Sequence, residues 1–229
     1  MSTSPTTQEI AIEAGGRSGE VAGLLQIPSH ASRLLVFAHG AGAEMRHAFM
    51  DAAASVLGAH GIATLRYQFP YMQKKSRRPD PPAVLQATVR GAVRAAAAAG
   101  PGLTLLAAGK SMGGRMTSLA AADEPLEGVR GLVFFGFPLH PAGRPSSERG
   151  AHLSRVTLPM LFLQGTRDRL AELERLRPLL AAIPRATLKV FEGADHSFHL
   201  PKSAGRTEDD VLSEIAQTVA DWGGSLPTT

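Results

Sequence analysis

Short, almost entirely apolar runs alternate along this chain with longer helix-like segments. The run RLLVFAH at residues 33–39 is representative, because an uninterrupted apolar run of this length indicates a strand buried on both faces. A helix is predicted next, over residues 45–59, and it ends at His60-Gly61, a common stop signal. This alternation predicts the α/β fold class, with a mostly parallel central sheet flanked by helices on both faces.

The same alternation continues to the end of the chain. Strands are predicted at residues 9–14, 20–27, 33–39, 62–69, 103–109, 129–136, 160–165 and 186–193. The first two form a hairpin-like opening. Helices are predicted at residues 45–59, 83–98, 112–122, 171–182 and 208–222. Because no repeat and no long linker divides the chain, we expect one domain over residues 1–229, with about eight N-terminal and about six C-terminal residues flexible.

Two long loops are predicted, at residues 70–82 and 138–155. The second is rich in proline and glycine and has room for only a short helical piece at residues 147–153, so we expect no substantial cap domain. The first carries the basic run KKSRR (Lys74 to Arg78), which we interpret as a solvated loop, or alternatively as a surface for acidic substrates. Without a cap, a site here should be shallow and solvent-accessible.

Composition excludes several classes of function. A net charge of +4 and an aromatic content of 5% argue against nucleic-acid binding. The most apolar stretch, residues 93–109, is interrupted by Arg94, Gly100 and Pro101 and does not resemble a membrane span. The chain has no cysteine, which excludes disulfides and cysteine nucleophiles. Since no signal peptide is apparent at the N-terminus, we expect a cytoplasmic protein.

The stretch AAGKSMGGR at residues 107–115 has two interpretations, and the first is a phosphate-binding P-loop. That loop needs a glycine at position 104, where the chain has Thr104 inside a predicted strand. A second nucleotide-like pattern begins at Gly40, but Met45 stands where a dinucleotide-binding fingerprint needs its third glycine. Neither pattern therefore predicts a nucleotide site.

The second interpretation is the G-x-S-x-G turn that holds a nucleophilic serine. Here a strand ends at Gly109 and a helix begins near Met112, as that turn requires. Gly109 and Gly113 are needed because side chains two residues before and after the nucleophile would collide. The turn also places Ser111 at a helix N-terminus, where the helix dipole favours developing negative charge. The alternative is that Ser111 only caps the helix.

A serine nucleophile needs a base and an acid that orients the base. Asp168 and His196 each follow a later predicted strand, in the order serine, acid, histidine. We therefore predict a triad of Ser111, His196 and Asp168. The alternatives are Asp195 as the acid, Asp168 as a surface loop residue, and His196 as a buried structural histidine.

An oxyanion hole needs two backbone N–H groups aimed at the developing alkoxide. We expect one from Met112, the residue after the nucleophile, and the other from Ala41, with Gly42 as the alternative. His39 precedes this loop and is predicted to brace it by donating a hydrogen bond.

No metal ion or organic cofactor is expected. The pairs His47/Asp51 and His196/His199 have ligand-like spacing, but no third ligand accompanies either pair.

These motifs resemble the α/β-hydrolase superfamily, and within it the small cap-less, dienelactone-hydrolase-like hydrolases of the KANL/Tex type. The similar segments are FAHGAGA, LRYQFPYM, GKSMGGRM, LFLQGTRD and GADHSF, and they cover most of the chain. The resemblance implies the same three triad residues. It implies no particular substrate, and dienelactone hydrolases proper use a cysteine nucleophile, which this chain lacks.

Together the residues and the resemblance predict a serine hydrolase acting on a small-molecule acyl substrate. A carboxylic ester with a short acyl chain of about two to four carbons is the expected substrate, because a shallow site buries few methylenes. A peptidase, amidase or thioesterase could use the same triad. An interaction module that keeps the fold without turnover is the non-enzymatic alternative, and we expect binding neither to nucleic acid nor to membranes.

Overall fold

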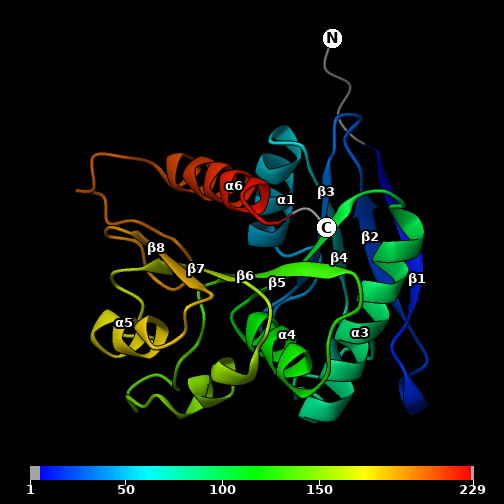
Figure 1. Cartoon of the computed structure of the whole chain (residues 1–229), viewed down its shortest axis with the longest axis horizontal. Helices are drawn as coiled ribbons and strands as arrows, with labels where there is room; N and C mark the ends of the chain where they lie inside the picture. The colour runs from blue at the N-terminus through cyan, green and yellow to red at the C-terminus, as the bar shows by residue number, and fades with distance from the viewer. Residues whose placement is uncertain (1–5, 228–229) are drawn as a thin grey trace.

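The computed structural model describes residues 6–227. Its centre is a single eight-stranded sheet, and helices pack on both faces of that sheet (Figure 1). The strands are β1 (Thr7–Glu13), β2 (Glu20–Gln26), β3 (Arg33–Ala38), β4 (Ile62–Tyr67), β5 (Thr104–Lys110), β6 (Val129–Phe135), β7 (Met160–Gly165) and β8 (Ala186–Phe191). The helices are α1 (Ala48–Ala59), α2 (Pro70–Gln73), α3 (Pro82–Ala99), α4 (Met112–Asp123), α5 (Leu173–Ala181) and α6 (Glu208–Gly224), with short 3-10 helices η1 (Gly16–Ser18) and η2 (Glu148–Arg155).

The sheet order is β1-β2-β4-β3-β5-β6-β7-β8. Strands β1 and β2 form an antiparallel hairpin, and β2 also runs antiparallel to β4. From β4 to β8 all neighbouring strands are parallel. The carboxyl ends of these parallel strands therefore meet at one edge of the sheet, which is where α/β proteins bind ligands.

Alternate residues of one strand enter two separate hydrophobic cores. In β3, Leu34 and Val36 belong to the core under α3, α4 and α5, while Leu35 and Phe37 belong to the core under α1 and α6. Because both faces of the strand are covered, its interior positions are apolar on both sides, which explains the long apolar runs of the sequence.

The predicted fold class is confirmed, and so is the absence of a cap. Between β6 and β7 the chain forms only loops and the 3-10 helix η2, which overlaps the short helical piece predicted there. No described helix, in residues 6–227, is long and apolar enough to span a membrane.

Several predicted boundaries differ from the structure. Helix α1 begins at Ala48 rather than at residue 45, because the His47 side chain caps it by accepting the N–H of Phe49 at 3.2 Å. The helix α2 lies inside a predicted loop, and Pro70 starts it with its fixed φ. Strand β1 includes residues 7 and 8, and α6 includes residue 224, although we expected both places to be flexible. The remaining terminal residues, 1–5 and 228–229, lie outside the described part of the chain.

Candidate active site

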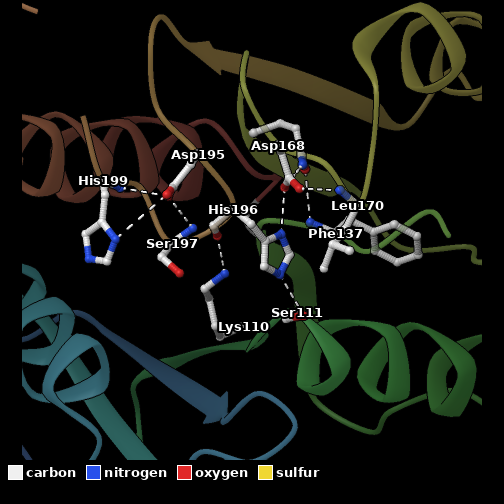
Figure 2. Close-up of polar contacts among 10 residues, drawn as sticks. Lys110, Ser111, Phe137, Asp168, Leu170, Asp195, His196, Ser197 and His199 are labelled. Atoms are coloured by element: carbon white, nitrogen blue, oxygen red, sulfur yellow. Dashed lines mark hydrogen bonds and ion pairs between the residues drawn. The ribbon is translucent and has the colours of Figure 1, made fainter. Parts of the chain in front are cut away.

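The three predicted triad residues come together at the carboxyl edge of the sheet. Ser111 directly follows β5, Asp168 lies in the loop after β7, and His196 lies in the loop after β8 (Figure 2). Residues 85 positions apart in the chain, Ser111 and His196, are in hydrogen-bond contact here.

Ser111 sits on a sharp strand-to-helix turn. Its backbone has φ 51° and ψ −118°, a conformation that costs non-glycine residues on the order of 1–3 kcal/mol. A Cβ at Gly109 would lie 2.1 Å from the backbone nitrogen of Gly114, and one at Gly113 would lie 2.6 Å from the carbonyl oxygen of Ala38. Glycine is therefore required on both sides of Ser111, as the G-x-S-x-G pattern predicted.

A chain of hydrogen bonds joins the three side chains. His196 Nδ1 lies 2.7 Å from Asp168 Oδ2, and His196 Nε2 lies 2.8 Å from Ser111 Oγ. Since a carboxylate can only accept, Nδ1 carries the proton that it donates, and Nε2 of the neutral ring is left to accept from the serine hydroxyl. This is the arrangement in which an imidazole can withdraw a proton from a serine.

Asp168 is held in place by three donors. Its carboxylate accepts from His196 Nδ1, from the side-chain amide of Gln164 and, at 2.8 Å, from the backbone N–H of Leu170. The backbone N–H of Phe137 donates to Gln164 Oε1 at 3.0 Å, so the amide nitrogen of Gln164 must face Asp168. Sequence reasoning missed Gln164, although a polar residue inside the apolar strand MLFLQG was a signal for it.

Asp195, the alternative acid, lies next to His196 but is engaged elsewhere. Its Oδ1 accepts the backbone N–H groups of Ser197 at 2.8 Å and of His199 at 3.0 Å (Figure 2). Within residues 6–227 no hydrogen bond joins it to the imidazole of His196. Asp195 therefore folds the loop that carries His196, while Asp168 contacts the ring itself.

The loop after β3 lies against the serine turn. A Cβ at Gly40 would be 3.6 Å from the Cβ of Ser111, and Ala41 lines the same cavity as Ser111. Within residues 6–227 the N–H groups of Ala41 and Met112 donate no hydrogen bond to another protein group. These are free donors of the kind that an oxyanion requires. The N–H of Gly42 remains the alternative to that of Ala41.

His39 supports this loop by donating a hydrogen bond to it, as the sequence predicted. Its Nδ1 donates to the carbonyl oxygen of Gly40 at 2.8 Å, and its Nε2 accepts the backbone N–H of Phe69 at 3.1 Å. Only the neutral ring can do both. Burial lowers the pKa of His39 from 6.5 to about 4, although the hydrogen bond to the carbonyl oxygen of Gly40 opposes this shift.

We therefore expect the protein to lose stability in mild acid. Between about pH 6.5 and pH 4, His39 is protonated in the unfolded chain but stays neutral in the folded chain. The free energy of unfolding therefore falls as the pH is lowered through this range. The contribution of His39 to this loss should be on the order of 2–3 kcal/mol. Urea unfolding at several pH values measures it, and the same series on His39→Gln should show a shallower slope. An equal slope in both proteins would contradict the assignment.

A cavity of about 610 Å³ opens beside Ser111. Its apolar wall comes from the start of α1, the loop after β8 and the start of α6, and it includes Ala48, Phe49, Met50, Ala52, Phe198 and Leu212. An apolar wall of this extent was not expected from the sequence. Sequence reasoning looked for walls in the two proline-rich loops, but neither loop lines this cavity. The basic residues Lys74, Lys75, Arg77 and Arg78 are exposed and lie outside it.

The ligand-like pairs serve other purposes. Asp51 forms an ion pair with Arg66, and His199 lies 3.8 Å from both Asp195 and Glu208. In the part of the chain that the structure describes, no group of three or more His, Cys, Asp or Glu side chains is placed to hold a metal ion.

A family model and two curated relatives match this chain over most of its length. The model of a family described as alpha/beta hydrolase domain matches residues 31–224. Two curated relatives, both from Mycobacterium tuberculosis and both named putative phosphoribosyl transferase, are 30% identical over 220 residues, covering 94% of this chain and 45% of theirs. The chain thus spans about half the length of these relatives.

Solved structures of similar fold cover almost the whole chain. The dienelactone hydrolase from Anabaena variabilis superposes with a TM-score of 0.78 at 22% identity, covering 99% of this chain and 100% of that one. A Xanthomonas campestris protein described as an α/β serine hydrolase without lid superposes with a TM-score of 0.73 at 23% identity, covering 97% and 96%. At these identities the likeness establishes the fold.

Proposed function

Because the chain belongs to the alpha/beta hydrolase domain family, we propose that it is a serine hydrolase that cleaves carboxylic esters of small acids. The observation that supports this most directly is the hydrogen-bonded series from Asp168 through His196 to Ser111. Each member has the partner that its role requires, and the serine faces a cavity of substrate size.

The reaction proceeds in two halves. His196 Nε2 takes the hydroxyl proton as Ser111 Oγ attacks the ester carbonyl carbon. The N–H groups of Ala41 and Met112 hold the resulting oxyanion, and the N-terminus of α4 adds its favourable dipole. The protonated imidazole then donates its proton to the departing alcohol. A water molecule, deprotonated by the same imidazole, hydrolyses the acyl-enzyme and regenerates Ser111.

The same triad could equally cleave thioesters or amides, which are the alternative substrate classes. The name phosphoribosyl transferase belongs to proteins of which this chain matches less than half, so it does not indicate what this chain does. The chain has no cysteine and therefore needs no oxidising compartment, which is compatible with the cytoplasm as the proposed location.

The cavity wall predicts how turnover depends on chain length. In a series of p-nitrophenyl esters, we expect kcat/KM to rise from acetate to about hexanoate, by at most about fourfold per methylene, since each buried CH₂ contributes about 0.8 kcal/mol. In Ala52→Phe the new ring should fill part of the cavity, remove this rise and leave acetate turnover within about twofold of wild type.

The control is Ser55→Phe, which adds the same ring to an exposed position of α1 outside the cavity. It should keep the wild-type profile. No turnover of any ester, with turnover of thioesters or amides, would replace the proposed substrate class. A profile unchanged by Ala52→Phe would show that neither chain of the ester enters this cavity.

A further inference from the structure

Lys110, the lysine that suggested a P-loop, has a different environment in the structure. It is the last residue of β5, only 9% exposed, and lies directly before Ser111. Its Nζ donates a hydrogen bond to the backbone carbonyl oxygen of His196 (Figure 2). A single side chain thus connects the strand that presents the serine to the main chain of the histidine.

Two phenylalanine rings and a glycine surround Nζ at this contact. Nζ lies 5.6 Å from the ring centroid of Phe49 and 5.7 Å from that of Phe198, and these two rings stack on each other. A Cβ at Gly136 would be 3.1 Å from both Nζ and the carbonyl oxygen of His196. A side chain at position 136 would therefore crowd both the ammonium and the oxygen that it reaches, and Gly136 has a positive φ of 69°.

Burying the ammonium of Lys110 lowers the stability of the folded chain, because the charge loses its hydration. Burial lowers the pKa of Lys110 to about 8, although Asp168 and Asp195 favour its charge. An apolar side chain of similar length would avoid that desolvation cost and could make the protein more stable. Stability alone therefore does not account for a lysine here.

The loop that carries His196 is attached on one side to the loop after β7, where the backbone N–H of Arg167 donates to the carbonyl oxygen of Ala194 at 2.9 Å. Phe198 holds a left-handed backbone conformation, φ 66°, which is strained for a bulky residue. Asp195 ties the loop to itself. Among the hydrogen bonds of residues 6–227, that from Lys110 is the one that ties the main chain of His196 to the serine strand.

We propose that Lys110 is a positioning residue: its ammonium fixes the main chain of His196 at the end of β5, so that the imidazole stays within reach of Ser111. This inference rests on the proposed hydrolase function. A displacement of about 1 Å in a reacting group can cost about 10²-fold in rate, so the support acts on turnover and not on substrate binding.

The first test compares Lys110→Met with wild type. Methionine keeps the length and apolar stem but cannot donate. We expect kcat for ester hydrolysis to fall between about 10-fold and 10²-fold with KM within about twofold, slower labelling by a fluorophosphonate probe, and a melting temperature no lower than that of wild type. Lys189→Met is the matched control, because Lys189 also lies over a phenylalanine but pairs with Glu214, and it should retain wild-type kcat.

A second variant restores the ammonium chemically. The natural chain has no cysteine, so Lys110→Cys carries a single thiol, which 2-bromoethylamine converts into a lysine analogue of equal length. We expect Lys110→Cys to be as slow as Lys110→Met, and alkylation to one equivalent, checked by intact mass, to recover at least about tenfold of the lost kcat. This variant also serves if Lys110→Met does not fold.

Three results would overturn the inference: wild-type kcat in Lys110→Met, a loss of kcat that follows a loss of melting temperature, or alkylation without recovery. These are distinguishable from failure of the proposed function. If the wild type itself neither reacts with the fluorophosphonate nor hydrolyses any ester, the hydrolase proposal fails first. If the wild type does both and Lys110→Met does them equally well, only the role of Lys110 is wrong.

Discussion

Ser111→Ala is expected to lower kcat for ester hydrolysis by about 10⁶-fold, because losing a triad nucleophile removes the function of the whole triad. The substitution deletes only Oγ and its bond to His196 Nε2, so the circular dichroism spectrum and melting temperature should remain close to those of wild type. Covalent labelling by a fluorophosphonate probe, read by intact mass, should disappear completely.

Ser118→Ala is the control for this experiment. Ser118 is buried on α4, and its Oγ lies 2.7 Å from Nε2 of His152, so it belongs to a second serine–histidine pair. No described acidic side chain hydrogen-bonds to His152, and the pair lies outside the cavity. We expect Ser118→Ala to keep probe labelling and most of kcat. If Ser111→Ala kept more than a few per cent of the activity, Ser111 would not be the nucleophile.

Asp168→Asn is expected to cost about 10⁴-fold in kcat. The carboxylate accepts from Gln164, Leu170 and His196 Nδ1 at once. An asparagine has one oxygen and one NH₂ group, so one of these donors must face another donor. Where the NH₂ group faces His196, the ring proton moves to Nε2, which then no longer accepts from Ser111; where the oxygen faces His196, the imidazolium still loses the negative charge that stabilises it. Steady-state kinetics on a short ester measure the loss.

Asp195→Asn should cost less than about tenfold by the same assay. The asparagine Oδ1 can still accept from Ser197 and His199, so the loop keeps its turn. A larger loss in Asp195→Asn than in Asp168→Asn would reverse the assignment of the acid.

Much of this fold and site follows from local patterns. A strand covered on both faces is apolar over most of its length, so RLLVFAH could be placed without a structure. Gly109 and Gly113 are required by the turn at Ser111 itself, which is why the serine was identifiable from five letters. The order of Ser111, Asp168 and His196 along parallel strands brings them to one edge of the sheet by topology alone.

Other features depend on contacts between distant segments, and no local pattern encodes them. Asp168 and Asp195 both follow strands near His196, and only the orientation of each carboxylate in the folded chain separates their roles. The cavity is formed where α1 and α6 meet. Its size depends on how these two helices pack against each other, which the sequence of neither helix shows by itself. The Nζ of Lys110 donates to a carbonyl oxygen 86 positions away. The sequence does not indicate this partner, because it is fixed only when burial removes water as the alternative acceptor.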